Sequence, residues 1–286
     1  MQPADPFLEF AATIAVPVGE RLYLLLDQSG VPGIAMLWPE IKGLPRACIL
    51  GLEHAQPDGA SPLVVDVSDK DSSRTVARTL ERIYAQARFA NALSFICSRL
   101  PLDEVTNALC ERTKVELPDQ MSVLLRFFDT RTLPLLPRLL TTAQYAAFVS
   151  AFSSWHYVDR YGQLIPMQGS VSQGEAAIFK APLILNVEQE RLLIDDGTAD
   201  AVIDQLIDQR HPVFAGTSPP QQYDMIAPLV EAARKVGISD LHEVLLFCCA
   251  GLTQGRDFEQ RPPWAERLAQ HRRGAISLQE ALTDAA

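Results

Sequence analysis

The sequence predicts a two-lobe protein of the α+β or α/β class, in which an N-terminal mixed β-sheet with helices precedes a C-terminal all-helical lobe. Short apolar runs separated by turn residues recur before residue 165, a pattern typical of buried strands. Amphipathic helical patterns lie between these runs. Beyond residue 175 only the helical pattern continues. We therefore expect an N-terminal α/β lobe at 1–165 and a helical lobe at 175–286.

The N-terminal lobe is predicted from alternating strand and helix patterns. Its first core strand is expected at Arg21–Asp27, a Leu- and Tyr-rich run that ends before the turn residues Ser29 and Gly30. Further strands are expected in apolar runs at 47–52, 62–67, 92–98, 121–128 and 155–161. Helices are expected at 34–41, 73–88, 101–117, 130–136 and 141–152. This alternation indicates layers of helix and sheet.

A segment rich in Gly, Gln and Ser at 162–174 lacks helical periodicity and is the predicted domain boundary. After it, helices are expected at 187–207, 223–236, 239–252 and 264–270, followed by a short final helix with a capping box at Ser277 and Glu280. Asp195-Asp196-Gly197 lies inside the first of these helices but lacks the spacing of a calcium loop. We interpret it as an interruption of the helix.

Composition limits the function classes. The formal net charge of -10 and the pI near 5.0 argue against a nucleic-acid-binding surface, which needs clustered Lys and Arg. The five cysteines form no CxxC pair and lie mostly within apolar patterns, so buried reduced thiols are expected, as in the cytoplasm. No run approaches the ~18 apolar residues that span a bilayer. We expect a cytoplasmic protein with no cofactor, no nucleic-acid partner and no membrane contact.

The stretch at 121–140 differs most from generic globular sequence. Apolar residues fill both alternating faces at 121–128, which predicts a central strand covered on both sides. Arg126 lies inside this run, so its guanidinium needs a carboxylate or carbonyl partner, or an opening in the surface. A structural ion pair is favoured over a ligand contact. Asp129 points to the opposite face of such a strand, and it is expected to cap a helix at 130–136 rather than bind a ligand.

Motifs for catalysis are missing from the sequence. It contains no GxxxxGK[ST], no GxGxxG after a strand, no HExxH and no GxSxG, and His156, alone beside aromatic residues, is expected to be packed. Composition and spacing thus predict a protein that is not an enzyme. The alternative is an α/β enzyme or small-molecule-binding protein of unrecognised class, which would bring Asp27, Arg126, Asp129 and His156 into one pocket. A subunit that oligomerises through its helical lobe is a third hypothesis.

The N-terminal lobe resembles the type VI secretion adaptor or effector-chaperone family, first catalogued as a domain of unknown function. The resemblance covers about residues 20 to 160 and rests on three segments, namely RLYLLLD, LSFICSRLPLDEVTNALCERTKVELPD and SVLLRFFDTRTLPLLPRLLTTAQYAAFVSAFSSW. Its sharpest motif is Arg126-Phe127-Phe128-Asp129, followed by Arg131 and by a Leu-Pro-x-Leu step at 136–139. The chain departs from the family pattern at 30–55 and at Pro134.

This resemblance implies a non-catalytic adaptor that binds a toxic effector and promotes its loading onto the VgrG spike of the type VI secretion system. The partners implied are the cognate effector and VgrG. An adaptor interface is expected to combine apolar anchors with a polar rim. We therefore expect partner binding at Arg126, Phe128, Asp129 and Arg131, with the aromatic residues exposed as anchors in a cleft between the lobes.

Overall fold

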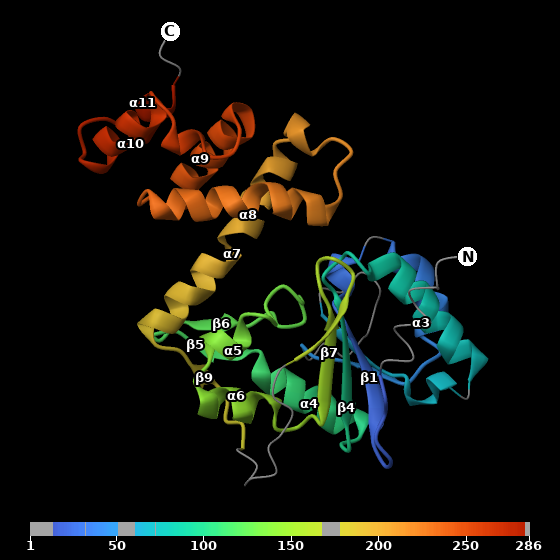
Figure 1. Cartoon of the computed structure of the whole chain (residues 1–286). Helices are drawn as coiled ribbons and strands as arrows, with labels where there is room; N and C mark the ends of the chain where they lie inside the picture. Colours follow the sequence, from blue (N-terminus) through green and yellow to red (C-terminus); the bar gives the residue numbers. More distant parts are fainter. Residues whose placement is uncertain (1–13, 32, 51–60, 72, 168–177, 284–286) are drawn as a thin grey trace. The chain divides into compact units, whose positions relative to one another are not determined.

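The computed structural model describes residues 14–31, 33–50, 61–71, 73–167 and 178–283 (Figure 1). The chain divides into two compact units, residues 1–192 and 193–286. The predicted fold class is confirmed, because β-sheets with helices form the N-terminal region and helices alone follow in the described residues beyond 187. The predicted domain boundary at 162–174 lies partly outside the described residues and stays a prediction.

A six-stranded sheet forms the centre of the first unit. In spatial order its strands are β2 (Arg46–Cys48), β3 (Leu63–Asp66), β1 (Arg21–Leu26), β4 (Leu93–Ser98), β7 (Ser154–Val158) and β8 (Leu164–Pro166). Every neighbouring pair is antiparallel, and in the central strand Leu24 lies opposite both Val65 and Phe95. Helix α3 (Arg74–Ala87) joins β3 to β4, which flank β1 and are therefore parallel to each other.

Alternate side chains of the sheet enter two different cores. Leu22, Leu24 and Leu26 pack with the apolar stripe of α3, and this core also contains residues of the short helices η2 (Ile34–Leu37) and α2 (Trp38–Ile41). The α3 stripe includes Leu80 and Ile83. Helix α4 (Leu102–Arg112) contacts β2 and β3 and lies on the other side of the strands from α3 (Figure 1). The sheet is thus covered on both faces.

The second core is aromatic and contains a buried cation. Helix α6 (Thr142–Val149) contributes Phe148, and Arg112 of α4 donates hydrogen bonds to the carbonyl oxygens of Phe148 and Ala147 near the C-terminus of α6. Its guanidinium lies 4.9 Å from the ring centroid of Phe152 and 4.7 Å from that of Phe179. Burial lowers the pKa of Arg112 to about 10. Within the described ranges no carboxylate pairs with Arg112, so carbonyl oxygens and aromatic rings stabilise this charge.

A second, three-stranded sheet corrects the prediction for 121–128. Its order is β6 (Ser122–Leu124), β5 (Lys114–Glu116) and β9 (Leu183–Ile184), with one antiparallel and one parallel pairing. The predicted central strand is wrong, because β6 is a three-residue edge strand in which Leu124 is 46% exposed. The chain leaves the sheet after Leu124 and turns, so the apolar pattern of Phe127 and Phe128 serves the aromatic core instead of continuing a strand.

The predicted helix at 130–136 is also wrong. Successive turns occupy this segment, and the short helix α5 covers Leu136–Leu139. Pro137 lies in the first turn of α5 instead of ending a helix. A proline is tolerated there because the backbone N–H groups of the first turn have no hydrogen-bond partner within the helix. The capping box predicted at Thr141 and Gln144 is confirmed at the start of α6.

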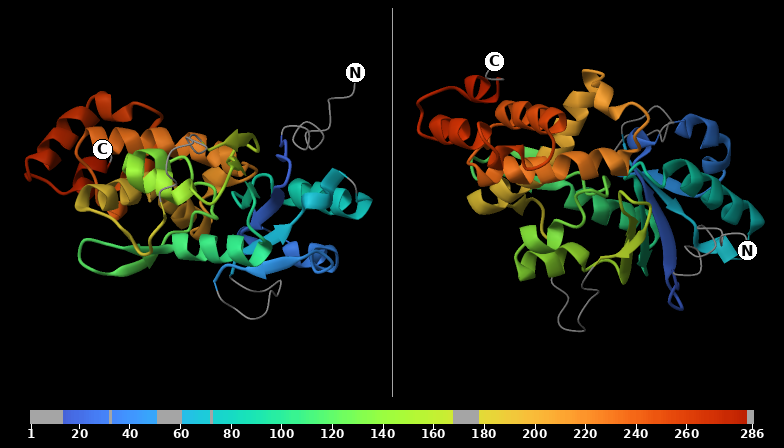
Figure 2. Two further views of the ribbon diagram at one scale, coloured as in Figure 1. Left: turned by 90° about the horizontal axis from the view of Figure 1, so that it is seen from below. Right: turned by 45° about the horizontal axis from the view of Figure 1, so that its top comes forward.

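The C-terminal unit is built from helices in the described residues (Figure 2). They are α7 (Val187–Asp208), which begins in the first unit, α8 (Pro219–Lys235), α9 (Leu241–Gln254), α10 (Trp264–Arg272) and α11 (Leu278–Leu282). Helix α7 continues through Gly197, so the predicted interruption at 195–197 is wrong. One glycine costs a helix about 1 kcal/mol relative to alanine, which packing can offset.

The core of the C-terminal unit depends on close packing of helices. The rings of Phe247 and Phe258 lie 4.9 Å apart between centroids. Gly251 of α9 faces α8 so closely that a Cβ there would lie 2.5 Å from the Cδ2 atom of Leu229. Among the described helices of the whole chain, none has the length and apolar character needed to cross a membrane.

Candidate functional site

One end of the six-stranded sheet gathers the polar residues that the sequence singled out. Because β1 and β7 both pair antiparallel with β4, their C-terminal ends meet at the end where β4 begins. The segment at residues 126–132, here called the Arg126 loop, is fixed at this end by Thr130. The backbone N–H of Thr130 donates to the Asn91 carbonyl at 2.8 Å, and the Thr130 hydroxyl donates to the Val158 carbonyl at 2.7 Å.

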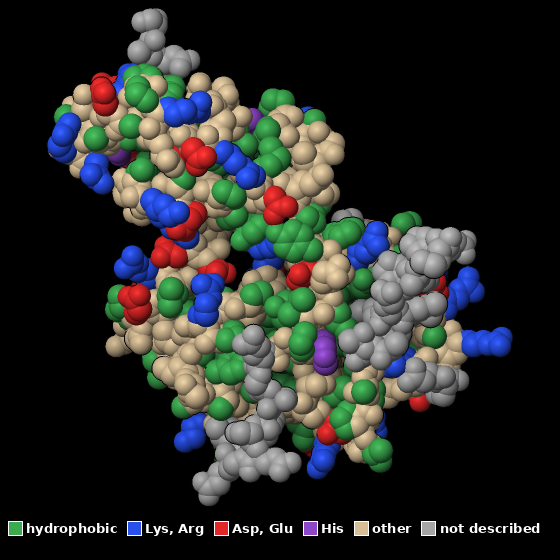
Figure 3. Space-filling view, in the orientation of Figure 1, with side chains coloured by type: hydrophobic (Ala, Val, Ile, Leu, Met, Phe, Trp, Pro, Cys, Tyr) green, Lys and Arg blue, Asp and Glu red, His purple; other side chains and the backbone are tan. Residues whose placement is uncertain are grey.

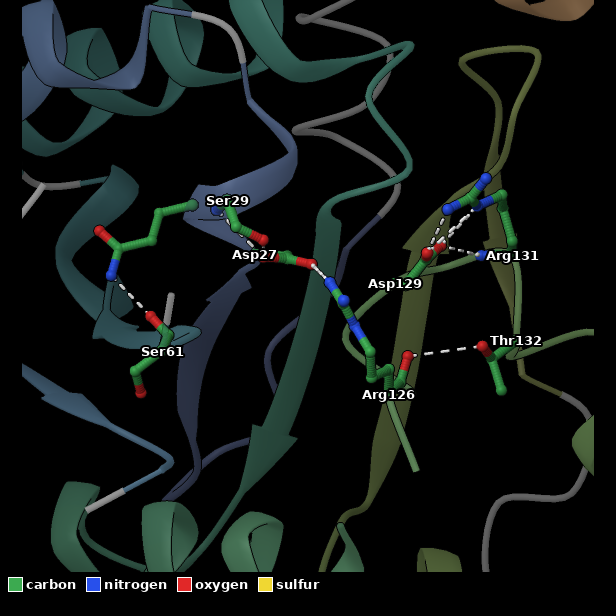
Figure 4. Close-up of polar contacts among 8 residues, drawn as sticks. Asp27, Ser29, Ser61, Arg126, Asp129, Arg131 and Thr132 are labelled. Carbon is green, nitrogen blue, oxygen red and sulfur yellow. Dashed lines mark hydrogen bonds and ion pairs between the residues drawn. The ribbon is translucent and has the colours of Figure 1, made fainter. Parts of the chain in front are cut away.

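Arg126 is held at the surface by a buried carboxylate. Its Nη2 atom lies 3.3 Å from Oδ2 of Asp27, which follows β1 (Figure 4). The guanidinium also lies 5.4 Å from the ring centroid of Phe128. The Asp27 side chain is 4% exposed and also accepts hydrogen bonds from the backbone N–H and the hydroxyl of Ser29, whereas the Arg126 side chain is 56% exposed. The predicted ion pair for Arg126 is confirmed, and most of its donors still face solvent.

Asp129 and Arg131 form a separate pair within the Arg126 loop. Oδ1 of Asp129 accepts hydrogen bonds from the Arg131 backbone N–H at 3.1 Å and from Nε at 2.9 Å, and Oδ2 accepts from Nη2 at 2.6 Å (Figure 4). This two-pronged arrangement fixes the Arg131 side chain. Asp129 therefore closes a local turn, and it does not cap the helix predicted at 130–136, which is absent from this described segment.

The aromatic residues of the motif are buried, so the expectation of exposed anchors is wrong. Phe128 is 2% exposed. Phe127 is fully buried, with ring centroids 5.6 Å from Phe148 and from Trp155. Both phenylalanines hold the Arg126 loop against the protein. Whether Arg126, Phe128, Asp129 and Arg131 act in partner binding stays a prediction.

Two aromatic residues that sequence reasoning missed are exposed at the same end of the sheet. Phe89 precedes β4 and Tyr161 follows β7. The Arg88 guanidinium lies 4.7 Å from the Phe89 ring centroid, and a Cβ at Gly162 would lie 2.9 Å from the Phe89 ring. The sequence did contain a signal for their exposure, because Phe89 falls outside the apolar stripe of α3 and a glycine, typical of turns, follows Tyr161. This end of the sheet thus carries exposed arginine and aromatic side chains. The exposed aromatic residues are Phe89 and Tyr161, whereas Phe127 and Phe128 are buried.

His156 lies apart from these residues. It belongs to β7 and lines a cavity of about 190 Å³ together with Phe152, Trp155, Pro166 and Met167 among others. Burial lowers its pKa, and its Nδ1 atom has no hydrogen-bond partner in the described part of the chain. The described lining of this cavity does not include Asp27, Arg126 or Asp129.

Charges of both signs are interspersed on the face of the molecule drawn in Figure 3. The described residues contain no group of three or more His, Cys, Asp or Glu side chains that would hold a metal ion. All five cysteines are free thiols, and burial raises the pKa of Cys248 to about 12. The polar features of the candidate site are therefore the Arg126–Asp27 pair and the Asp129–Arg131 pair.

Comparison with known families matches one part of the chain. Residues 22–147 match the model of a family described as a domain of unknown function, DUF4123. The matched region runs from β1 to α6 and contains the whole Arg126 loop. Searches of curated proteins and of solved structures found no match.

Proposed function

We propose that this chain is a non-enzymatic adaptor that binds a type VI secretion effector in the cytoplasm of the producing cell and promotes its loading onto the VgrG spike. The observation that carries the proposal is the match of residues 22–147 to DUF4123, a family associated with adaptors of type VI effectors. The matched region includes the pinned, exposed Arg126.

The geometry of Arg126 suits recognition of a partner. Its guanidinium is oriented by Asp27 from one side and by the Phe128 ring, so little side-chain freedom remains to be lost on binding. The outward donors can bind a carboxylate or carbonyl of the effector. Phe89 and Tyr161, exposed at the same end of the sheet, supply apolar contact. Within the motif, Arg126 is thus the contact residue, and the Phe128 ring supports its guanidinium.

The alternative of an α/β enzyme or small-molecule-binding protein has less support. It requires Asp27, Arg126, Asp129 and His156 in one pocket. Asp27 and Arg126 form one pair, Asp129 pairs with Arg131, and His156 lines a cavity of its own. The arrangement therefore favours a surface that binds a protein.

The test is capture of type VI effector and VgrG proteins from the same organism. Arg126→Gln should weaken effector capture by at least about tenfold, since a charged hydrogen bond contributes about 1.5–3 kcal/mol and about 1.4 kcal/mol corresponds to tenfold. Arg99→Gln is the matched control, because Arg99 is also an exposed arginine paired with a buried carboxylate, that of Glu20 at 3.5 Å. If the wild-type chain captures neither protein, the adaptor function is wrong. If both variants capture the effector equally, Arg126 is not the contact.

A further inference from the structure

The two sheets of the described chain have four edge strands, β2, β8, β6 and β9. An edge strand carries unpaired backbone N–H and C=O groups, to which another chain can add a strand. Proteins protect such edges with charged residues, proline, very short strands or covering side chains. How each edge is protected therefore indicates which one is left open for a partner.

Three of these edges carry such protection. β8 ends in Pro166, and β2 contains Arg46, whose guanidinium donates to the Lys42 carbonyl at 2.7 Å. β9 has only two residues, and the carbonyl of Ile184 accepts a hydrogen bond from Gln144 at 2.9 Å. The sequence of β6, Ser-Val-Leu, has none of these features.

The backbone pattern shows which groups of β6 are open. The Leu117 N–H donates to the Met121 carbonyl at 2.9 Å, and the Leu125 N–H donates to the Thr113 carbonyl at 2.8 Å. In an antiparallel pair, hydrogen-bonded and non-hydrogen-bonded positions alternate. Ser122 and Leu124 therefore direct their N–H and C=O groups away from β5, and among the described residues these groups have no partner.

Apolar side chains accompany these open groups. Leu124 is 46% exposed and Met121, directly before β6, is 53% exposed. They point to opposite faces of the sheet because they are three residues apart. In the left view of Figure 2 the hairpin of β5 and β6 extends beyond the end of α4. An added strand would find apolar contact on both of its faces.

We infer that the free edge of β6 receives an extended segment of the effector, which adds to the sheet as a strand with apolar residues at alternate positions. The inference rests on the proposed adaptor function. Arg126 lies two residues after Leu124, so the edge and the proposed contact residue are continuous along the chain. A carboxylate on the same segment, beyond its apolar residues, would pair with Arg126.

A second copy of this chain fits the edge less well. Each copy carries a formal net charge of -10, so two copies repel each other. A pairing of β6 with itself would engage three residues on each side, whereas a stable interface uses about 20–30 residues a side. An effector segment would extend the contact beyond the three residues of β6, because a carboxylate on it can also pair with the exposed Arg126.

The test uses the full chain and the full-length effector that the capture experiment identifies. Ser122→Pro removes only an outward N–H and leaves the pairing with β5 intact, and Leu124→Lys places a charge on the edge. Each should weaken effector binding about tenfold. Ser122→Ala and Ile184→Lys, the latter on the exposed edge strand β9 of the same sheet, should stay within about twofold of wild type. Circular dichroism establishes that each variant is folded.

Hydrogen exchange gives a second measurement. The amides of Ser122 and Leu124 should exchange fast in the free chain and become protected with effector. Equal effector binding by all four variants, without this protection, overturns the inference and leaves the adaptor function standing. Loss of VgrG binding alone would assign the edge to the spike, and a dimer that Ser122→Pro dissociates would assign it to a second copy. Either result overturns the inference, and a wild-type chain that binds no effector overturns both proposals.

Discussion

Arginines are used differently in the two units of this protein. In the helical unit two of them donate to carbonyl oxygens at helix ends. Arg261 donates to the carbonyl of Gln254, the last residue of α9, and Arg267 donates to the carbonyls of Glu280 and Thr283 around the end of α11. In the sheet unit Arg126 is paired with Asp27, 99 residues earlier in the sequence, and still directs donors outward. The difference separates arginines that complete helices, as Arg112 also does in the sheet unit, from one that is available to a partner.

The largest expected effect concerns Arg112, which joins α4 to α6 inside the sheet unit. Arg112→Ala should lower the free energy of unfolding by about 3 kcal/mol, because it leaves buried carbonyl oxygens without donors and a space among three phenylalanine rings. Arg272→Ala, on an exposed arginine of the helical unit, should change it by less than about 0.5 kcal/mol. Urea titrations followed by circular dichroism measure both values, and equal losses would remove the contrast between the units.

The second prediction tests the packing of the helical unit with two glycines. Gly251→Ala should destabilise it by about 2 kcal/mol, since the new Cβ would collide with Leu229. Gly197→Ala places a Cβ where nothing lies within 4 Å, and it should stabilise α7 by about 0.5–1 kcal/mol. Thermal unfolding monitored at 222 nm compares the two. A Gly251→Ala protein as stable as wild type would show that the Leu229 side chain can move aside without loss of packing.

The smallest effect is the pH dependence of His156. Burial lowers the pKa of this side chain in the folded state, so folding favours the neutral ring. The stability gained from this preference is fully present above the pKa of the unfolded state, about 6.5. It is lost as the pH falls through the lower pKa of the folded state. Wild-type protein should therefore lose more stability than His156→Phe between about pH 7.5 and pH 5. Parallel losses in urea titrations of both proteins would assign the acid sensitivity to other groups.

Elements with a strong local pattern could be predicted from the sequence. The apolar run of β1, the stripe of α3 and the capping box of α6 each determine their structure within a few residues. The run at 121–128 could not be interpreted in the same way, because Met121 and Leu124 are exposed at an edge strand whereas Phe127 is buried in the aromatic core. Only the tertiary structure decides where a strand ends and a buried turn begins.

The candidate site was predicted in part. The need of Arg126 for a partner follows from its apolar neighbours, but the identity of Asp27 depends on strand order, which local sequence does not determine. The exposure of Phe127 and Phe128 was predicted incorrectly for the same reason. Phe89 was missed because a single aromatic residue in a turn has no periodicity. Tyr161 was assigned to the strand predicted at 155–161, but β7 ends at Val158.

The open edge of β6 has a consequence for handling the purified protein. An unprotected edge strand promotes association of identical chains, and in the absence of cargo the strong negative charge opposes it. Salt screens that repulsion, with a Debye length of about 10 Å at 0.1 M falling to about 3 Å at 1 M. Light scattering from the cargo-free chain should therefore rise with salt concentration, and a buffer of low ionic strength is the better choice for storage.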